Sequence, residues 1–115
     1  MIIRPYNYEF AMPPARKWTR IEDLAVLHLY RGKVAHDSRE VAALAAAIER
    51  SSKSIGARMQ AFAGLDPANP YSPSGKATGL TQSVWGEYLA DRTAIAIEGQ
   101  RAYLGILNRY SMGRP

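Results

Sequence analysis

The sequence predicts an all-α protein, with three short helices between residues 18 and 63 and a C-terminal helix or helical hairpin at 81–115. Three observations predict this class. Apolar residues recur at helical spacing, capping residues stand where each periodic segment would begin, and no segment alternates as a strand does. An extended arm at 1–17 precedes the three helices, and a loop at 64–80 follows them.

The amino-acid composition narrows the classes of function that the protein can have. The chain has 115 residues, which suits one domain, and it contains no cysteine, which excludes a disulfide framework and a thiolate metal site. Its net charge of +5 favours a polyanionic partner. The positive charge gathers on the arm and on residues 50–58. No apolar run approaches the ~18 residues of a membrane span, and no signal peptide is visible, so we expect a cytoplasmic protein.

The first helix is expected near residues 19–31. Thr19 and Glu22 stand at the positions of a capping box, in which each side chain binds the other residue's backbone N–H. We interpret Asp23 as a charge that suits a helix N-terminus, in preference to a catalytic carboxylate paired with Glu22. Gly32 would end the helix.

The second helix is expected near residues 38–49, where Asp37 and Glu40 resemble another capping box. Its inward stripe would be Val41, Leu44, Ala45 and Ile48.

The third helix is expected near residues 52–63, capped by Ser51 and closed by Gly64. Its buried row would be Ile55, Met59 and Phe62. Trp18 and Trp85 are expected to anchor the core.

Prolines and glycines mark residues 64–80 as a loop. A fourth helix would begin near Thr81 or Ser83. It either continues towards Tyr110 or breaks near Gly99 or Gly105.

Three short helices with a tight turn before the third are typical of helix-turn-helix units that read DNA. A step of 100° per residue from the inward Ile55 defines an outer face on the third helix. That face holds Lys53, Gly56, Ala57 and Gln60, with Ser54 and Arg58 on its flanks. Gln60 would pair with adenine, Lys53 or Arg58 would bind phosphate or guanine, and the small residues would allow close approach. An ordinary solvated helix carries the same residue types, so this geometry leaves both interpretations open.

The run Trp18-Thr19-Arg20, with Glu22, Leu27 and Leu29-Tyr30, resembles the opening of Myb/SANT-like helix-turn-helix domains. Residues 18–91 further resemble the N-terminal domain of bacterial HNH endonuclease-like proteins. The matching pieces, in order, are Trp18-Thr19-Arg20, Leu29-Tyr30, Glu40-Val41, Leu44-Ala45, Arg50-Ser51, Ile55, Met59, Phe62, Leu65-Asp66-Pro67, Gly79-Leu80, Val84-Trp85 and Glu87-Tyr88.

Two features depart from that family pattern. The stretch between Leu80 and Val84 is shorter, and His28 and His36 form no histidine-asparagine-histidine arrangement. The resemblance therefore implies a DNA-recognition module without a nuclease domain, and we expect no enzymatic activity. The two histidines match no familiar ligand spacing with Asp37 or Glu40, so neither a metal nor another cofactor is expected.

The expected partner is double-stranded DNA, for a regulator of phage, plasmid or defence genes at a bacterial nucleoid. The expected DNA-binding residues are Arg50, Lys53, Ser54, Gly56, Ala57, Arg58 and Gln60 in or before the third helix, and Arg16, Lys17 and Arg20 near the arm. The arm would enter a minor groove or follow phosphates, unless it is a solubilising tail.

Other partners remain open. A second copy of the chain would pair two DNA half-sites. A protein partner would make the chain an adaptor or an inhibitor of a nucleic-acid enzyme, and a separate nuclease subunit would make it part of an enzyme.

Overall fold

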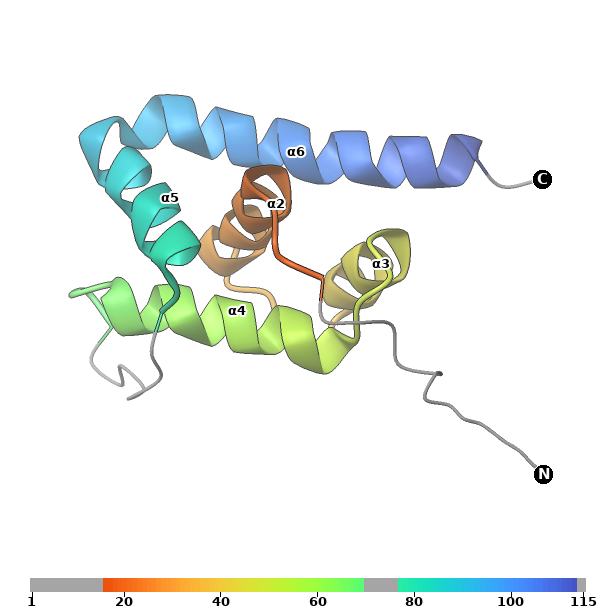
Figure 1. The fold of residues 1–115 in the computed structure, drawn as a ribbon, viewed down its shortest axis with the longest axis horizontal. Coiled ribbons are helices and arrows are strands. Elements are labelled where there is room, and N and C mark those ends of the chain that lie inside the picture. The colour runs from red at the N-terminus through yellow and green to blue at the C-terminus, as the bar shows by residue number, and fades with distance from the viewer. Residues whose placement is uncertain (1–15, 70–76, 114–115) are drawn as a thin grey trace.

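The computed structural model describes residues 16–69 and 77–113. Residues 1–15 of the expected arm at 1–17, and residues 70–76 of the expected loop at 64–80, therefore lie outside the described residues. All regular structure in the described part is helical, which confirms the all-α prediction there. The helices are α2 (Arg20–Arg31), α3 (Arg39–Ala47), α4 (Ser52–Leu65), α5 (Gly79–Ala90) and α6 (Arg92–Met112) (Figure 1).

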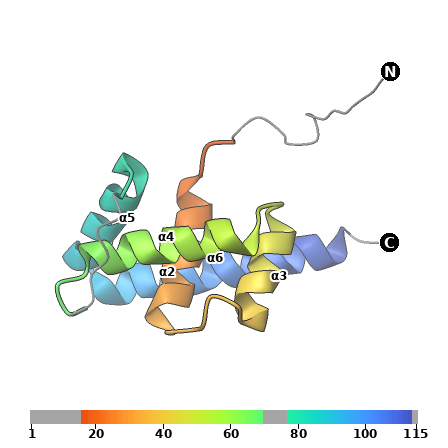
Figure 2. The same cartoon turned by 90° about the horizontal axis from the view of Figure 1, so that it is seen from below.

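Helix α2 is the centre of the fold. It crosses between α4 and α6, which lie on its opposite sides, while α3 and α5 flank it (Figures 1 and 2). Four of its residues have no exposed surface: Asp23, Ala25, Val26 and Leu27. A helix that is buried on all sides acts as a core element, so α2 is more enclosed than its amphipathic pattern indicated.

Helix α6 packs on α2, α3 and α5. Its Ile95, Tyr103 and Ile106 are buried in the same core as Leu27 and Val41. At Gly99 the backbone of α6 lies so close to α2 that an added Cβ would be 2.9 Å from the Leu24 carbonyl oxygen. The segments separated in the sequence by the proline-rich loop therefore share one core.

Two of the predicted helix caps are confirmed and one is wrong. Thr19 Oγ1 accepts from the Glu22 N–H at 3.2 Å and Glu22 Oε1 accepts from the Thr19 N–H at 3.1 Å, which completes the capping box. Ser51 caps α4. Helix α3 begins instead at Ser38, whose Oγ accepts from the Val41 N–H at 3.2 Å. This start puts Glu40 at the second helical position, one residue short of a capping box.

The C-terminal region differs from expectation in its boundaries. Helix α4 runs one residue past Gly64, and α5 begins at Gly79 behind an N-cap at Thr78. The helical structure is interrupted at Asp91, which lies between α5 and α6. Asp91 Oδ1 accepts from the Ala94 N–H at 3.1 Å and so caps the start of α6. The breaks considered at Gly99 and Gly105 do not occur.

Candidate nucleic-acid interface

Helix α4 presents one face to the core and the other to solvent. Ile55, Met59 and Phe62 are buried, as the apolar row predicted. Lys53, Ala57 and Gln60 are exposed on the outer side. The sequence of α4 contains no acidic residue, so the helix itself offers cationic, amide and methyl groups. Asp37, in the turn before α3, borders the same face.

The turn that connects α3 to α4 is short and has a defined geometry. The Arg50 N–H donates to the Ala45 carbonyl at 2.9 Å, and the Glu49 N–H donates to the Ala46 carbonyl at 3.4 Å. These two bonds form a Schellman motif, with Glu49 in the left-handed conformation at φ 56°. Ser51 Oγ then accepts from the Ser54 N–H at 3.0 Å and begins α4. Ser54 is half-buried beside this cap.

Arg58 lies inside the protein, which corrects its expected position on the flank of the outer face. Its Nε donates to Asp23 Oδ1 at 2.9 Å and its Nη2 donates to Asp23 Oδ2 at 2.7 Å. Thr81 Oγ1 donates to the same Oδ2 at 3.0 Å, and Arg58 Nη1 donates to Thr78 Oγ1 at 3.2 Å. Arg58 therefore joins α4 to α2 and to the start of α5.

Gly56 is also buried, and its surroundings explain why. A Cβ built at Gly56 would lie 3.1 Å from Nδ1 of His36, in the turn between α2 and α3. The glycine therefore allows that turn to pack on α4, which differs from the expected role of bringing α4 close to base edges.

Arg50 is held by groups of the protein itself. Its Nη2 donates to the carbonyls of Arg16 and Lys17 and to Glu22 Oε1, each at 3.2 Å. Its guanidinium carbon lies 4.0 Å from the centroid of the Trp18 ring, and that of Arg58 lies 4.6 Å from the same centroid. The half-buried Trp18 thus stacks with two arginines, while Trp85 is buried in the core as expected.

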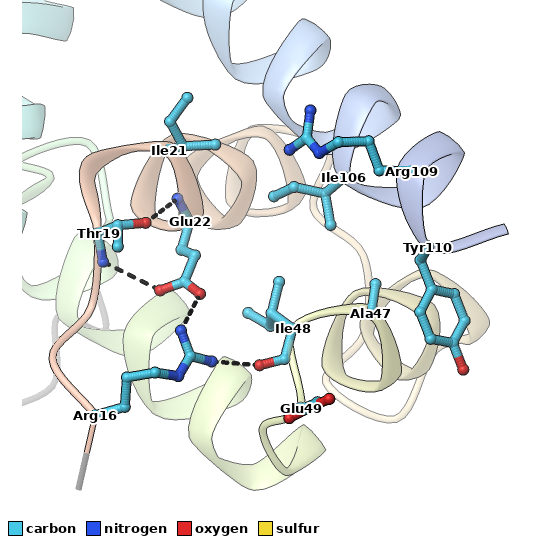
Figure 3. A pocket seen from close by; sticks show the side chains of 10 residues that line it. All are labelled: Arg16, Thr19, Ile21, Glu22, Ala47, Ile48, Glu49, Ile106, Arg109 and Tyr110. Carbon is cyan, nitrogen blue, oxygen red and sulfur yellow. Dashed lines mark hydrogen bonds and ion pairs between the residues drawn. The ribbon is translucent and has the colours of Figure 1, made fainter. Parts of the chain in front are cut away.

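Arg16 is half exposed, and its guanidinium lies against Glu22 and Ile48 (Figure 3). Its Nη1 lies 2.8 Å from Glu22 Oε2, and its Nη2 donates to the carbonyl of Ile48. Burial alone would raise the pKa of Glu22, but hydrogen bonds from Arg16, the Thr19 N–H and Arg50 outweigh it and lower that pKa. Lys17 remains exposed.

An open hollow of about 600 Å³ lies beside this contact. Figure 3 shows the side chains that line it. It lies between the start of α2, the end of α3 and the last turns of α6. Its lining residues are Arg16, Thr19, Ile21, Glu22, Ala47, Ile48, Glu49, Ile106, Arg109 and Tyr110.

Arg20 is exposed, and its side chain forms ion pairs with two glutamates. Its Nη2 lies 2.6 Å from Glu87 Oε1 and 3.1 Å from Glu98 Oε1. The hydrogen bond with Glu87 is the main cause of the raised pKa of Arg20, followed by that with Glu98. Arg20 therefore ties α2 to α5 and α6, at a distance in sequence that no local pattern reveals.

The burial of Asp23 was not predicted from the sequence. The sequence does contain a signal for this burial, because Asp23 lies one helical turn before Leu27, on the apolar side of α2. A carboxylate on an apolar stripe needs a buried donor. The identity of that donor, Arg58, depends on how α2 and α4 pack.

His28 packs on Tyr103, with ring centroids 5.1 Å apart, and burial is the main cause of its lowered pKa. Across residues 16–69 and 77–113, His, Asp and Glu side chains do not form any group of three that could hold a metal ion.

Comparisons with family models, with curated proteins and with solved structures find no match to this chain. The Myb/SANT-like resemblance therefore depends only on the residues quoted for it. None of the described helices combines the length and the apolar character needed to cross a lipid bilayer.

Proposed function

We propose that this protein binds duplex DNA through the outer face of α4, as a Myb/SANT-like helix-turn-helix unit formed by α2, α3 and α4. One observation carries the proposal: α4 exposes Lys53, Ala57 and Gln60 on one stripe and contains no acidic residue. The short α3–α4 turn supports it, because tight turns of this kind precede reading helices in such units.

The exposed side chains of α4 suit different parts of the DNA. The side-chain N–H of Gln60 can donate to adenine N7 while its carbonyl oxygen accepts from the adenine N6 amino group. Lys53, in the first turn of α4, suits a phosphate. Arg50 and Arg58 act indirectly, since both hold α4 and its turn in place from inside the protein. Lys17 is the exposed cation nearest in sequence to Trp18 and would add a phosphate contact.

The proposal is tested by binding to labelled duplex DNA at two salt concentrations. Lys53→Ala should weaken binding to all sequences and reduce the salt slope by about one unit. Gln60→Ala should cost about 1–3 kcal/mol at a preferred site and relax the preference at one base pair. The matched controls are Arg101→Ala and Gln100→Ala, at exposed positions on α6.

The Lys53 and Gln60 variants and the two controls should all have the free energy of unfolding of the parent, because surface substitutions change stability by about 0.5 kcal/mol or less. Equal DNA binding by the parent and by a Lys53→Ala, Gln60→Ala double variant would show that α4 is not the reader.

A second candidate is a protein-interaction role. Ile97 and Leu104, seven residues apart on α6, are 43% and 54% exposed. Side chains two helical turns apart share a face, so they could contact a second copy of the chain. Light scattering tests this: a concentration-dependent dimer that Leu104→Glu abolishes would favour pairing through α6, and a monomer throughout would exclude it.

A further inference from the structure

The outer face of α4 borders a shallow hollow of about 600 Å³. It lies between α4, the start of α3 and the turn before α3. Its lining combines small residues with a polar rim: Ala42, Gly56 and Ala57, and then His36, Asp37, Ser38, Ser52, Lys53 and Gln60.

Small side chains keep this hollow open. His36 already lies against the position that a Cβ of Gly56 would take, so the open space is bounded by other small side chains. Ala57 on α4 and Ala42 on α3 each line it with one methyl group. The hollow is therefore suited to a compact apolar group and is bordered by Gln60, an amide that can read a base edge.

The spacing along α4 matches neighbouring base pairs. Ala57 and Gln60 are three residues apart on one helix face, which is about 4.5 Å along the axis. Successive base pairs are about 3.4 Å apart. A helix lying in the major groove would therefore present the two residues to adjacent pairs, with Lys53 one turn before Ala57 to hold the phosphates.

We propose that the hollow at Ala57 receives the C5-methyl group of a thymine while Gln60 pairs with the adenine of the adjacent base pair. This inference depends on the proposed DNA binding. Alanine contacts with the thymine methyl and glutamine pairing with adenine are both established readout chemistries of the major groove. The net charge of +5 and the exposed Lys53 favour a polyanionic occupant, and Asp37 places one carboxylate on the rim of the hollow.

Replacing thymine by uracil tests the methyl contact, because it removes the methyl group and leaves the hydrogen-bonding edges unchanged. We would measure fluorescence anisotropy with alternating A-T, A-U and G-C duplexes of equal length at ~100 mM salt. Binding should be tightest to the A-T duplex and about fourfold weaker to the A-U duplex, the loss expected for one buried methyl group.

Two variants test whether the difference in affinity between the A-T and A-U duplexes arises at the hollow. Ala57→Ser introduces a hydroxyl at an exposed position and should bring the A-T to A-U ratio close to one. Ala94→Ser, at an exposed alanine of α6, should keep the fourfold ratio. Circular dichroism checks that both variants fold.

The outcomes separate the two proposals. Equal affinity for the A-T and A-U duplexes, or a difference that persists in Ala57→Ser, overturns the thymine contact and leaves DNA binding standing. Failure to bind any of the three duplexes overturns the DNA-binding proposal as well.

Discussion

At the scale of single residues, Asp23 and Arg58 bring opposite charges into the interior where α2, α4 and α5 meet. The Asp23 side chain has no exposed surface and that of Arg58 is 10% exposed. Removing one partner would leave the other charge buried without compensation. Arg58→Ala or Asp23→Ala should therefore lower the free energy of unfolding by about 3–5 kcal/mol, as measured by urea denaturation.

A double variant tests whether the pair itself is the cause. Asp23→Leu combined with Arg58→Met removes both charges, so it should cost clearly less than the sum of the single losses. Arg101→Ala, which removes an exposed cation, is the control. If Arg58→Ala proved as mild as Arg101→Ala, the buried position of Arg58 would be contradicted.

Glu22 should make the protein sensitive to acid. Its pKa is lowered from the ordinary 4.5, so the folded state holds the proton less tightly than the unfolded state. The resulting stabilisation is fully present above pH 4.5 and is lost as the pH falls through the lowered pKa. Glu22→Gln should lower Tm at neutral pH, and its deficit should shrink as the pH falls towards ~3.

Thermal unfolding at a series of pH values measures this effect. Glu40→Gln, at an exposed position on α3, is the control and should leave the profile unchanged. Parent and Glu22→Gln profiles that run parallel from neutral to acid pH would contradict the assignment to Glu22.

At the scale of helices, two C-terminal ends adopt the left-handed conformation without glycine. Lys33 follows α2 with φ 56°, although Gly32 stands directly before it, and Glu49 follows α3 with φ 56°. A side chain in this conformation costs about 1 kcal/mol. Glu49→Gly should therefore stabilise the protein by about 1 kcal/mol in chemical denaturation.

Ala46→Gly gives the matched control, because it introduces the same residue within regular helix. It should destabilise by about 0.5–1 kcal/mol. If both substitutions destabilised the protein equally, the left-handed geometry of the α3–α4 turn would be wrong.

The helices also show which features local sequence can predict. Thr19 and Ser51 were predicted as caps because a cap depends on residues within one turn of each other. The break at Asp91 was missed, because glycines at 99 and 105 were weighed as helix breakers. Glycine inside a helix is tolerated where packing requires it. The exposed face of α4 was predicted at Lys53, Ala57 and Gln60, whereas the inward turn of Arg58 depends on a partner 35 residues away.

At the scale of the whole molecule, the contact between α2 and α6 joins the two halves of the chain, and Gly99 lies within this contact. A Cβ built at Gly99 would lie 2.9 Å from the Leu24 carbonyl oxygen, which is backbone and cannot rotate away. Gly99→Ala should therefore separate the two helices. We expect a loss of about 1–3 kcal/mol from overpacking, which exceeds the gain in helix propensity of up to about 1 kcal/mol.

A substitution at Gly86 on α5 is the control that measures the change in helix propensity without a change in packing. A Cβ there would meet no atom within 4 Å, so Gly86→Ala should stabilise the protein by about 0.5–1 kcal/mol. Differential scanning calorimetry of the two variants should give shifts in Tm of opposite sign. If Gly99→Ala also raised Tm, α6 would not lie against the Leu24 carbonyl, and the enclosure of α2 between α4 and α6 would have to be abandoned.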